Sequence, residues 1–213
     1  MERNLEIARY GMIDNTTANG CIDDIQFTSN NSTIACSCKS GEVYLYSGSS
    51  GFLKECQMMN QNSISVCCSF CDLTGVIYSG DRCGDICCFN VKTSNRLPNL
   101  KNHQSMVTAM AISPSEMLLA SGDCDGNLII WTTRSSQVSL SVPNAHSDSI
   151  TRLKFSPDSS TIWSSSVDGR VASWLCKDGK ALRSSRVSNF SVQSFDLSAN
   201  MYFSLNNMLC LKF

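Results

Sequence analysis

The stretch SGDCDGNLIIW contains two aspartates and a glycine close together, residue types that occur in metal-binding loops and in catalytic sites. Asp123 and Asp125 admit three interpretations: a calcium loop, a catalytic carboxylate pair, or the turn of a β-hairpin. A calcium loop needs a glycine after Asn127 and a bidentate glutamate at its twelfth position, where this chain has Leu128 and Arg134. A catalytic pair needs acids that converge from different parts of a cleft, whereas these two are neighbours on one turn. The hairpin turn is therefore favoured.

The other residues capable of chemistry are two histidines and thirteen cysteines. His103 and His146 have the side chain of a general base or a metal ligand. Five cysteines, in the segments CSC and CGDICC, have the residue type of a zinc site: Cys36, Cys38, Cys83, Cys87 and Cys88. Zinc sites usually pair C-x-x-C knuckles, whereas these cysteines fall in predicted strands, where cysteine packs as a small apolar residue. We predict no metal site.

No nucleophile elbow, phosphate loop or dinucleotide fingerprint occurs in the sequence. We therefore predict that the protein is not an enzyme and that it has neither a cofactor nor a small-molecule substrate.

A repeat of 43 residues accounts for the aspartates and both histidines. The opening stretch has a counterpart in SSSVDGRVASW, so that four residues recur in order: Ser121, Asp125, Gly126 and Trp131, then Ser164, Asp168, Gly169 and Trp174. A histidine precedes each of Asp125 and Asp168 by 22 residues, and the chain has no others. Two separate active sites are a poorer explanation of this coincidence than one repeated structural unit.

Weaker copies of the pattern extend the repeat over nearly the whole chain. After an N-terminal segment, 1–20, the approximate units are 21–60, 61–102, 103–145, 146–188 and a partial 189–213. Each contains three or four short runs with alternating apolar residues, separated by glycine, asparagine, aspartate or serine. The sequence predicts an all-β repeat protein.

The spacing of histidine, serine, aspartate and tryptophan resembles the WD-repeat family of β-propellers. In that family an aspartate usually follows the tryptophan, whereas this chain has Thr132 and Leu175 at these positions. The resemblance implies two buried hydrogen-bonded tetrads, His103, Ser121, Asp125 and Trp131, and His146, Ser164, Asp168 and Trp174. It also implies about five blades, fewer than the roughly seven of a typical propeller. We expect an incomplete part of a larger ring; the alternative is a five-bladed ring closed by the N-terminal stretch Leu5–Tyr10.

The same resemblance implies a non-enzymatic scaffold that binds other proteins through loops on one face. The expected contact residues are Gln104, Ser105, Met106, Asp123, Cys124, Ser147, Asp148, Ser149 and Val167. Three narrower roles remain open. One is a substrate receptor of a cullin-RING ubiquitin ligase, which Trp131 and Arg134 suggest. The others are a centrosomal γ-tubulin-targeting scaffold and a nucleic-acid-associated propeller in ribosome biogenesis.

Charge and composition bear on the partner and the compartment. The formal net charge is −1, which gives no general reason for nucleic acid as the partner. A basic run, Arg170, Lys177, Lys180, Arg183 and Arg186, keeps nucleic acid as a less favoured partner. The sequence has neither a membrane-spanning run nor a signal peptide, and its odd cysteine number argues against a disulfide framework. We expect a cytoplasmic or nuclear protein that binds no membrane.

Overall fold

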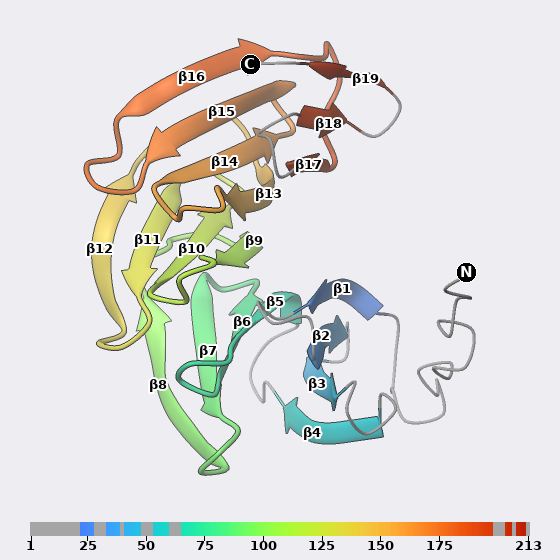
Figure 1. Ribbon diagram of the computed structural model, residues 1–213, viewed down its shortest axis with the longest axis vertical. Helices are drawn as coiled ribbons and strands as arrows, with labels where there is room; N and C mark the ends of the chain where they lie inside the picture. Colours follow the sequence, from blue (N-terminus) through green and yellow to red (C-terminus); the bar gives the residue numbers. More distant parts are fainter. Residues whose placement is uncertain are drawn as a thin grey trace, which may run out of the picture.

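Antiparallel β-sheets form the regular structure of the chain (Figure 1). The computed structural model describes residues 22–27, 33–38, 41–47, 53–59, 65–197, 203–205 and 208–211. Within these ranges there are four four-stranded sheets and one three-stranded sheet, and inside each sheet every strand after the first pairs with the strand before it.

The strands follow one another sheet by sheet along the chain. The first sheet contains β1 (Ile22–Phe27), β2 (Thr33–Cys38), β3 (Glu42–Ser47) and β4 (Leu53–Met59). The second contains β5 (Ser65–Cys71), β6 (Val76–Asp81), β7 (Asp85–Asn90) and β8 (Asn95–Lys101). The third contains β9 (Val107–Ile112), β10 (Leu118–Asp123), β11 (Leu128–Thr132) and β12 (Gln137–Val142). The fourth contains β13 (Ile150–Phe155), β14 (Thr161–Ser166), β15 (Arg170–Leu175) and β16 (Ala181–Arg186). The last contains β17 (Phe195–Leu197), β18 (Phe203–Leu205) and β19 (Met208–Leu211).

The sheets are arranged in an arc with their first strands on the inner side, as Figure 1 shows. Contacts between β1 and β5, β5 and β9, and β9 and β13 join each sheet to the next. The last strands β8, β12 and β16 lie on the outer side of the arc. This is a propeller-like arrangement, and the predicted all-β propeller fold is confirmed.

Burial along the strands follows from this arrangement. The second strands β6 and β14 are buried at every residue, because a neighbouring sheet packs on each of their faces. Two large apolar clusters lie between sheets, one joining the second to the third and the other joining the third to the fourth. The outer strands β12 and β16 are mostly exposed. The core is therefore divided into layers between neighbouring sheets.

Bulges recur at similar places in the first four sheets. The pairing of the third with the fourth strand shifts register just before Tyr46, Trp131 and Trp174 in the first, third and fourth sheets, and between Ile86 and Cys88 in the second. A bulge adds one residue and sharpens the twist of the strand. Its recurrence shows that the structural repeat includes the first and second sheets, where the sequence pattern is weak. Each described sheet also lies inside one of the predicted units.

Two predictions concern parts of the chain outside the described residues. The closing strand Leu5–Tyr10 and the N-terminal segment 1–20 both lie there, so the closed five-bladed ring and the partial propeller stay predictions. In the part of the chain that is described, no helix is long and apolar enough to cross a bilayer.

Candidate partner-binding face

A chain of buried hydrogen bonds crosses the third sheet from tryptophan to carboxylate. Trp131 Nε1 donates to the Ser121 hydroxyl oxygen at 2.8 Å. That oxygen lies 2.7 Å from Nε2 of His103, whose Nδ1 lies 2.8 Å from Asp123 Oδ2. The serine and the aspartate have no exposed surface. All four side chains are thus satisfied inside the protein.

The carboxylate of this tetrad is Asp123, so the prediction of Asp125 was wrong. Asp123 ends β10 beside the histidine, whereas Asp125 lies on the exposed turn two residues later. The second oxygen of Asp123 accepts the turn amides of Asp125 and Asn127 at 3.0 and 2.8 Å. Asp81 in the second sheet accepts the matching amides of Cys83 and Asp85 at 2.8 and 2.9 Å. The carboxylate at the end of the second strand therefore holds the backbone of the hairpin turn, and in the third sheet it also holds the histidine ring.

The fourth sheet holds its histidine with an aspartate from the other position. His146 Nδ1 lies 3.1 Å from Asp168 Oδ2, and its Nε2 lies 2.7 Å from the Ser164 hydroxyl. Trp174 Nε1 donates to that hydroxyl at 2.9 Å. Here all four predicted residues form the tetrad. Ser166 stands at the position of Asp123, and its hydroxyl oxygen accepts the amide of Asp168 at 3.1 Å.

The donors in each tetrad fit a neutral histidine. An indole N–H only donates, so the serine oxygen accepts it and can donate its own proton to imidazole Nε2. Nδ1 then carries the ring proton and donates to the carboxylate. Burial, which the neighbouring aspartate partly offsets, lowers the pKa of His103 and His146 below the usual 6.5. Although burial alone would raise it, hydrogen bonds hold the pKa of Asp123 and Asp168 below 3.8.

The tetrads position the loops of the predicted face. Cys124 N donates to Met106 O at 2.9 Å in the third sheet, and Val167 N donates to Ser149 O at 3.0 Å in the fourth. Each hairpin also contacts the loop that begins the next sheet, since His146 N donates to the carbonyl of Gly126 at 3.0 Å. A Cβ at Gly126, where φ is 83°, would lie 2.2 Å from the His146 carbonyl oxygen. Only glycine permits this approach.

Eight of the nine predicted contact residues have accessible surface on these loops. Four are exposed, Gln104, Ser147, Asp148 and Val167, and four are partly buried, Ser105, Met106, Cys124 and Ser149. Asp123 is fully buried in the tetrad, so its prediction as a contact residue was wrong. Sequence reasoning omitted Phe190, which is 82% exposed on the loop beside Gly169. It stands 43 residues after Ser147, so the repeat spacing could have found it.

The thiols of the cysteine segments are mostly buried. Cys36, Cys38, Cys87 and Cys88 lie in strands, and Cys83 is exposed on the β6–β7 turn. Burial raises the pKa of the Cys36 and Cys88 thiols to about 12, so these groups stay protonated and poor as ligands. The described residues contain no cluster of three or more candidate metal ligands.

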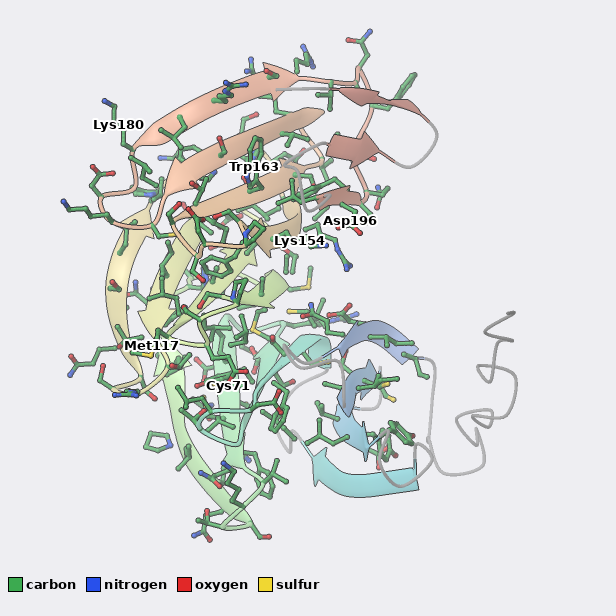
Figure 2. The ribbon with its side chains drawn as sticks, in the orientation of Figure 1. Cys71, Met117, Lys154, Trp163, Lys180 and Asp196 are labelled. Atoms are coloured by element: carbon green, nitrogen blue, oxygen red, sulfur yellow. The ribbon has the colours of Figure 1, made fainter. Side chains whose placement is uncertain are left out.

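The basic run lies on and around the outer edge of the fourth sheet. Its five side chains are all exposed: Arg170, Lys177, Lys180, Arg183 and Arg186. Arg170 pairs directly with Arg186 across β15 and β16, and Lys180 lies at the turn between these strands (Figure 2).

Known proteins with similar repeats match part of this chain. A family model described as "WD domain, G-beta repeat" matches residues 94–132 and 137–174. The chain is 31% identical to DmX-like protein 1 of Mus musculus over 72 residues. This match covers 34% of this chain and 2% of that protein. A chain in a crystal structure of the mitotic checkpoint complex superposes with a TM-score of 0.68 at 22% identity. The superposition covers 78% of this chain and 53% of that one, so this chain spans about half its length.

The matched ranges are offset by one strand from the sheets. Residues 94–132 contain β8 through β11, and residues 137–174 contain β12 through β15 except the last residue of β15, Leu175. Each matched unit therefore supplies the outer strand of one sheet and the three inner strands of the next.

Proposed function

Because this chain carries WD repeats on a propeller-like fold, we propose that it is a non-enzymatic scaffold that binds other proteins through the face described above. One observation carries the proposal. The tetrads and interlocked hairpins use buried groups to hold the backbone of these loops, while Gln104, Ser147, Asp148 and Val167 stay exposed to solvent. A rigid loop backbone lowers the entropy cost of binding a partner, because less of the loop has to be ordered on association.

The tetrads themselves are unsuited to catalysis, although each contains serine, histidine and aspartate. In a serine hydrolase the hydroxyl must reach a substrate carbonyl. Here Ser121 and Ser164 are fully buried, and each hydroxyl already accepts a tryptophan N–H. These residues therefore support a structural role.

The experiment is affinity capture with mass spectrometry. A variant with Gln104, Ser147, Asp148 and Val167 changed to alanine should lose captured proteins, because the four side chains are exposed on one face. A control with Gln137, Ser139 and Ser141 of β12 changed to alanine should keep them, since β12 lies on the outer side of the arc. If the first variant keeps every partner at wild-type abundance, the face is not the binding surface.

Nucleic acid is a second candidate partner, and one observation favours it. Arg170 and Arg186 are exposed directly opposite one another across two strands, and such like charges repel unless an anion lies between them. Binding of a labelled RNA should weaken steeply between about 50 and 200 mM salt if several phosphates are contacted. Changing both arginines to glutamine should then reduce the salt dependence; a flat salt response would remove this candidate.

The narrower roles and the compartment belong to the same proposal. Arg134 is exposed on the β11–β12 turn, which keeps it accessible to a ligase adaptor, while the ribosomal and centrosomal roles depend on the captured partners. A cytoplasmic or nuclear location is supported by the free thiols of ten described cysteines, and imaging of the tagged full chain tests it.

A further inference from the structure

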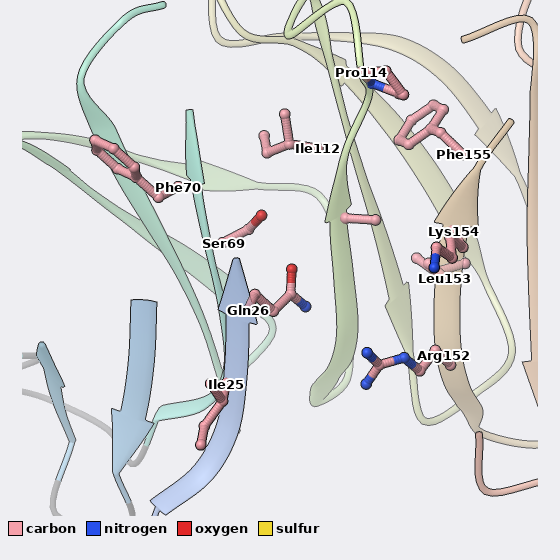
Figure 3. Close-up of a pocket in the computed structure, with 11 residues that line it drawn as sticks. Ile25, Gln26, Ser69, Phe70, Ile112, Pro114, Arg152, Leu153, Lys154 and Phe155 are labelled. Atoms are coloured by element: carbon pink, nitrogen blue, oxygen red, sulfur yellow. The ribbon is translucent and has the colours of Figure 1, made fainter. Parts of the chain in front are cut away.

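A cavity of about 430 Å³ lies on the inner side of the arc, between the first strands of four sheets (Figure 3). Its apolar walls include Phe70, Ile112, Pro114 and Phe155. Gln26 and Arg152 give it a polar side, and they also line a smaller cavity of about 150 Å³. The two side chains therefore lie where the two cavities adjoin.

Hydrogen bonds fix the position of Gln26. Its Nε2 donates to the carbonyl of Met110 at 3.0 Å and to Asp24 Oδ2 at 3.2 Å. The same carboxylate oxygen accepts the amide of Cys68 at 3.4 Å. The β1 side of the cavity is therefore a built polar wall whose own donors and acceptors are largely in use.

Arg152 is the unmatched charge of this cavity. It is half-buried in β13, and Figure 3 shows its guanidinium aimed across the cavity toward β1. None of the ion pairs among the described residues includes it. Asp24 and Asp196 attract its charge without forming an ion pair with it. Asp24 accepts hydrogen bonds from the donors named above. Asp196 forms an ion pair with Lys154, and Figure 2 labels the two residues near each other. The guanidinium fork keeps donors for an incoming group.

We propose that this cavity binds an acidic side chain of an extended peptide, with the carboxylate on Arg152 and a neighbouring apolar side chain of the peptide against Phe70, Ile112 and Phe155. The planar guanidinium matches a carboxylate with two parallel hydrogen bonds. These bonds are stronger in a half-buried site than in open water. The cavity volume is within the usual range of roughly 300 to 1,000 Å³ for ligand sites.

The apolar walls decide between a peptide and a small free anion. An inorganic anion would leave the apolar side chains that are not fully buried, Phe70, Ile112 and Pro114, in contact with water, whereas a peptide side chain beside the acid would cover them. A peptide that carries an acid and an apolar residue therefore satisfies both halves of the cavity.

This site is separate from the partner-binding face. Pro114 follows the end of β9, whereas Met106 precedes its start, so the apolar part of the cavity lies toward the opposite end of the inner strands. The inference does not depend on the proposed function, and alanine changes on the partner-binding face should leave peptide binding at the cavity unchanged.

Selection from a displayed library of random heptapeptides on the immobilised full chain tests the proposal. The enriched peptides should contain aspartate or glutamate next to a large apolar residue. Arg152→Met should weaken binding of the enriched peptide on the order of tenfold or more, the typical value of a hydrogen bond to a charged group. Replacing the peptide's acid by its amide should have a similar effect.

Three variants and two competitors make the result decisive. Arg134→Met removes an exposed arginine elsewhere and should leave affinity unchanged. Ile112→Trp fills the cavity while keeping Arg152, and it should block binding even if Arg152→Met proves unstable in thermal unfolding. Arg152→Lys keeps the charge without the fork and should give an intermediate loss. The proposal is wrong if no peptide is enriched, if enriched peptides lack an acid, or if they bind Arg152→Met or Ile112→Trp as tightly as wild type. It is also wrong if acetate or inorganic phosphate binds as tightly as the peptide.

Discussion

The third and fourth sheets hold equivalent histidines with carboxylates that stand two residues apart on the hairpin. In the third sheet Asp123 ends the strand and also accepts turn amides, while Asp125 faces solvent. In the fourth sheet serine replaces the first aspartate, and Asp168 on the turn reaches the histidine. The imidazole requires an acceptor near Nδ1, and either position can supply it. The tetrad is therefore defined by geometry more than by sequence position.

The largest effect should come from Asp123→Ala. This change removes the acceptor of His103 and of two turn amides in a fully buried site. We expect a loss of about 3 kcal/mol in the free energy of unfolding, because the buried imidazole N–H and the turn amides lose their acceptor. Chemical denaturation measures it. Asp125→Ala is the matched control and should stay within about 0.5 kcal/mol of wild type; equal losses would reverse our assignment of the carboxylate.

Asp168→Ala should cost less, about 1 to 2 kcal/mol. Its oxygen accepts from the buried His146, but also from the exposed Ser147, where water can replace the lost acceptor. Denaturation under the same conditions gives the value. A loss larger than that of Asp123→Ala would contradict the ranking of the two sites by burial.

Ser166→Asp tests whether the two positions are interchangeable. Placed in the Asp168→Ala background, the new carboxylate should reach His146 from the strand end and restore about 1 kcal/mol. A double-mutant cycle measures the coupling. If the double variant is no more stable than Asp168→Ala alone, the fourth hairpin differs from the third in backbone as well as in side chain.

The smallest effect is the pH dependence of stability near neutrality. Both histidines have folded-state pKa values below 6.5, so the unfolded chain binds protons first as the pH falls. Stability should thus be constant above about pH 7 and decrease from about pH 6.5 downward. Replacing His146 by glutamine should reduce this slope in denaturation curves collected between pH 7 and 5. A slope that is unchanged, or that has the opposite sign, would show that the histidine is charged in the folded protein.

Spacing located most residues of this site, and the family resemblance implied their roles. The 43-residue repeat singled out the histidines, serines and tryptophans, and the resemblance implied the hydrogen bonds that join them in both sheets. The choice of Asp125 failed because equal offset from Asp168 says nothing of which carboxylate lies closer to an imidazole. The inner cavity was beyond sequence reasoning, since Gln26 and Arg152 come to line the same cavity only through the arrangement of four sheets.

The one-strand offset between matched units and sheets has a consequence for how such a chain can change in evolution. A duplication or deletion of one unit, such as residues 94–132, would begin and end within sheets. The joined segments would still place an outer strand beside a third strand, because every unit carries the same kind of ends. Genetic gain or loss of a unit therefore alters the number of sheets. Each remaining sheet still takes its outer strand from the unit that follows its inner strands, as the third sheet takes β12 here.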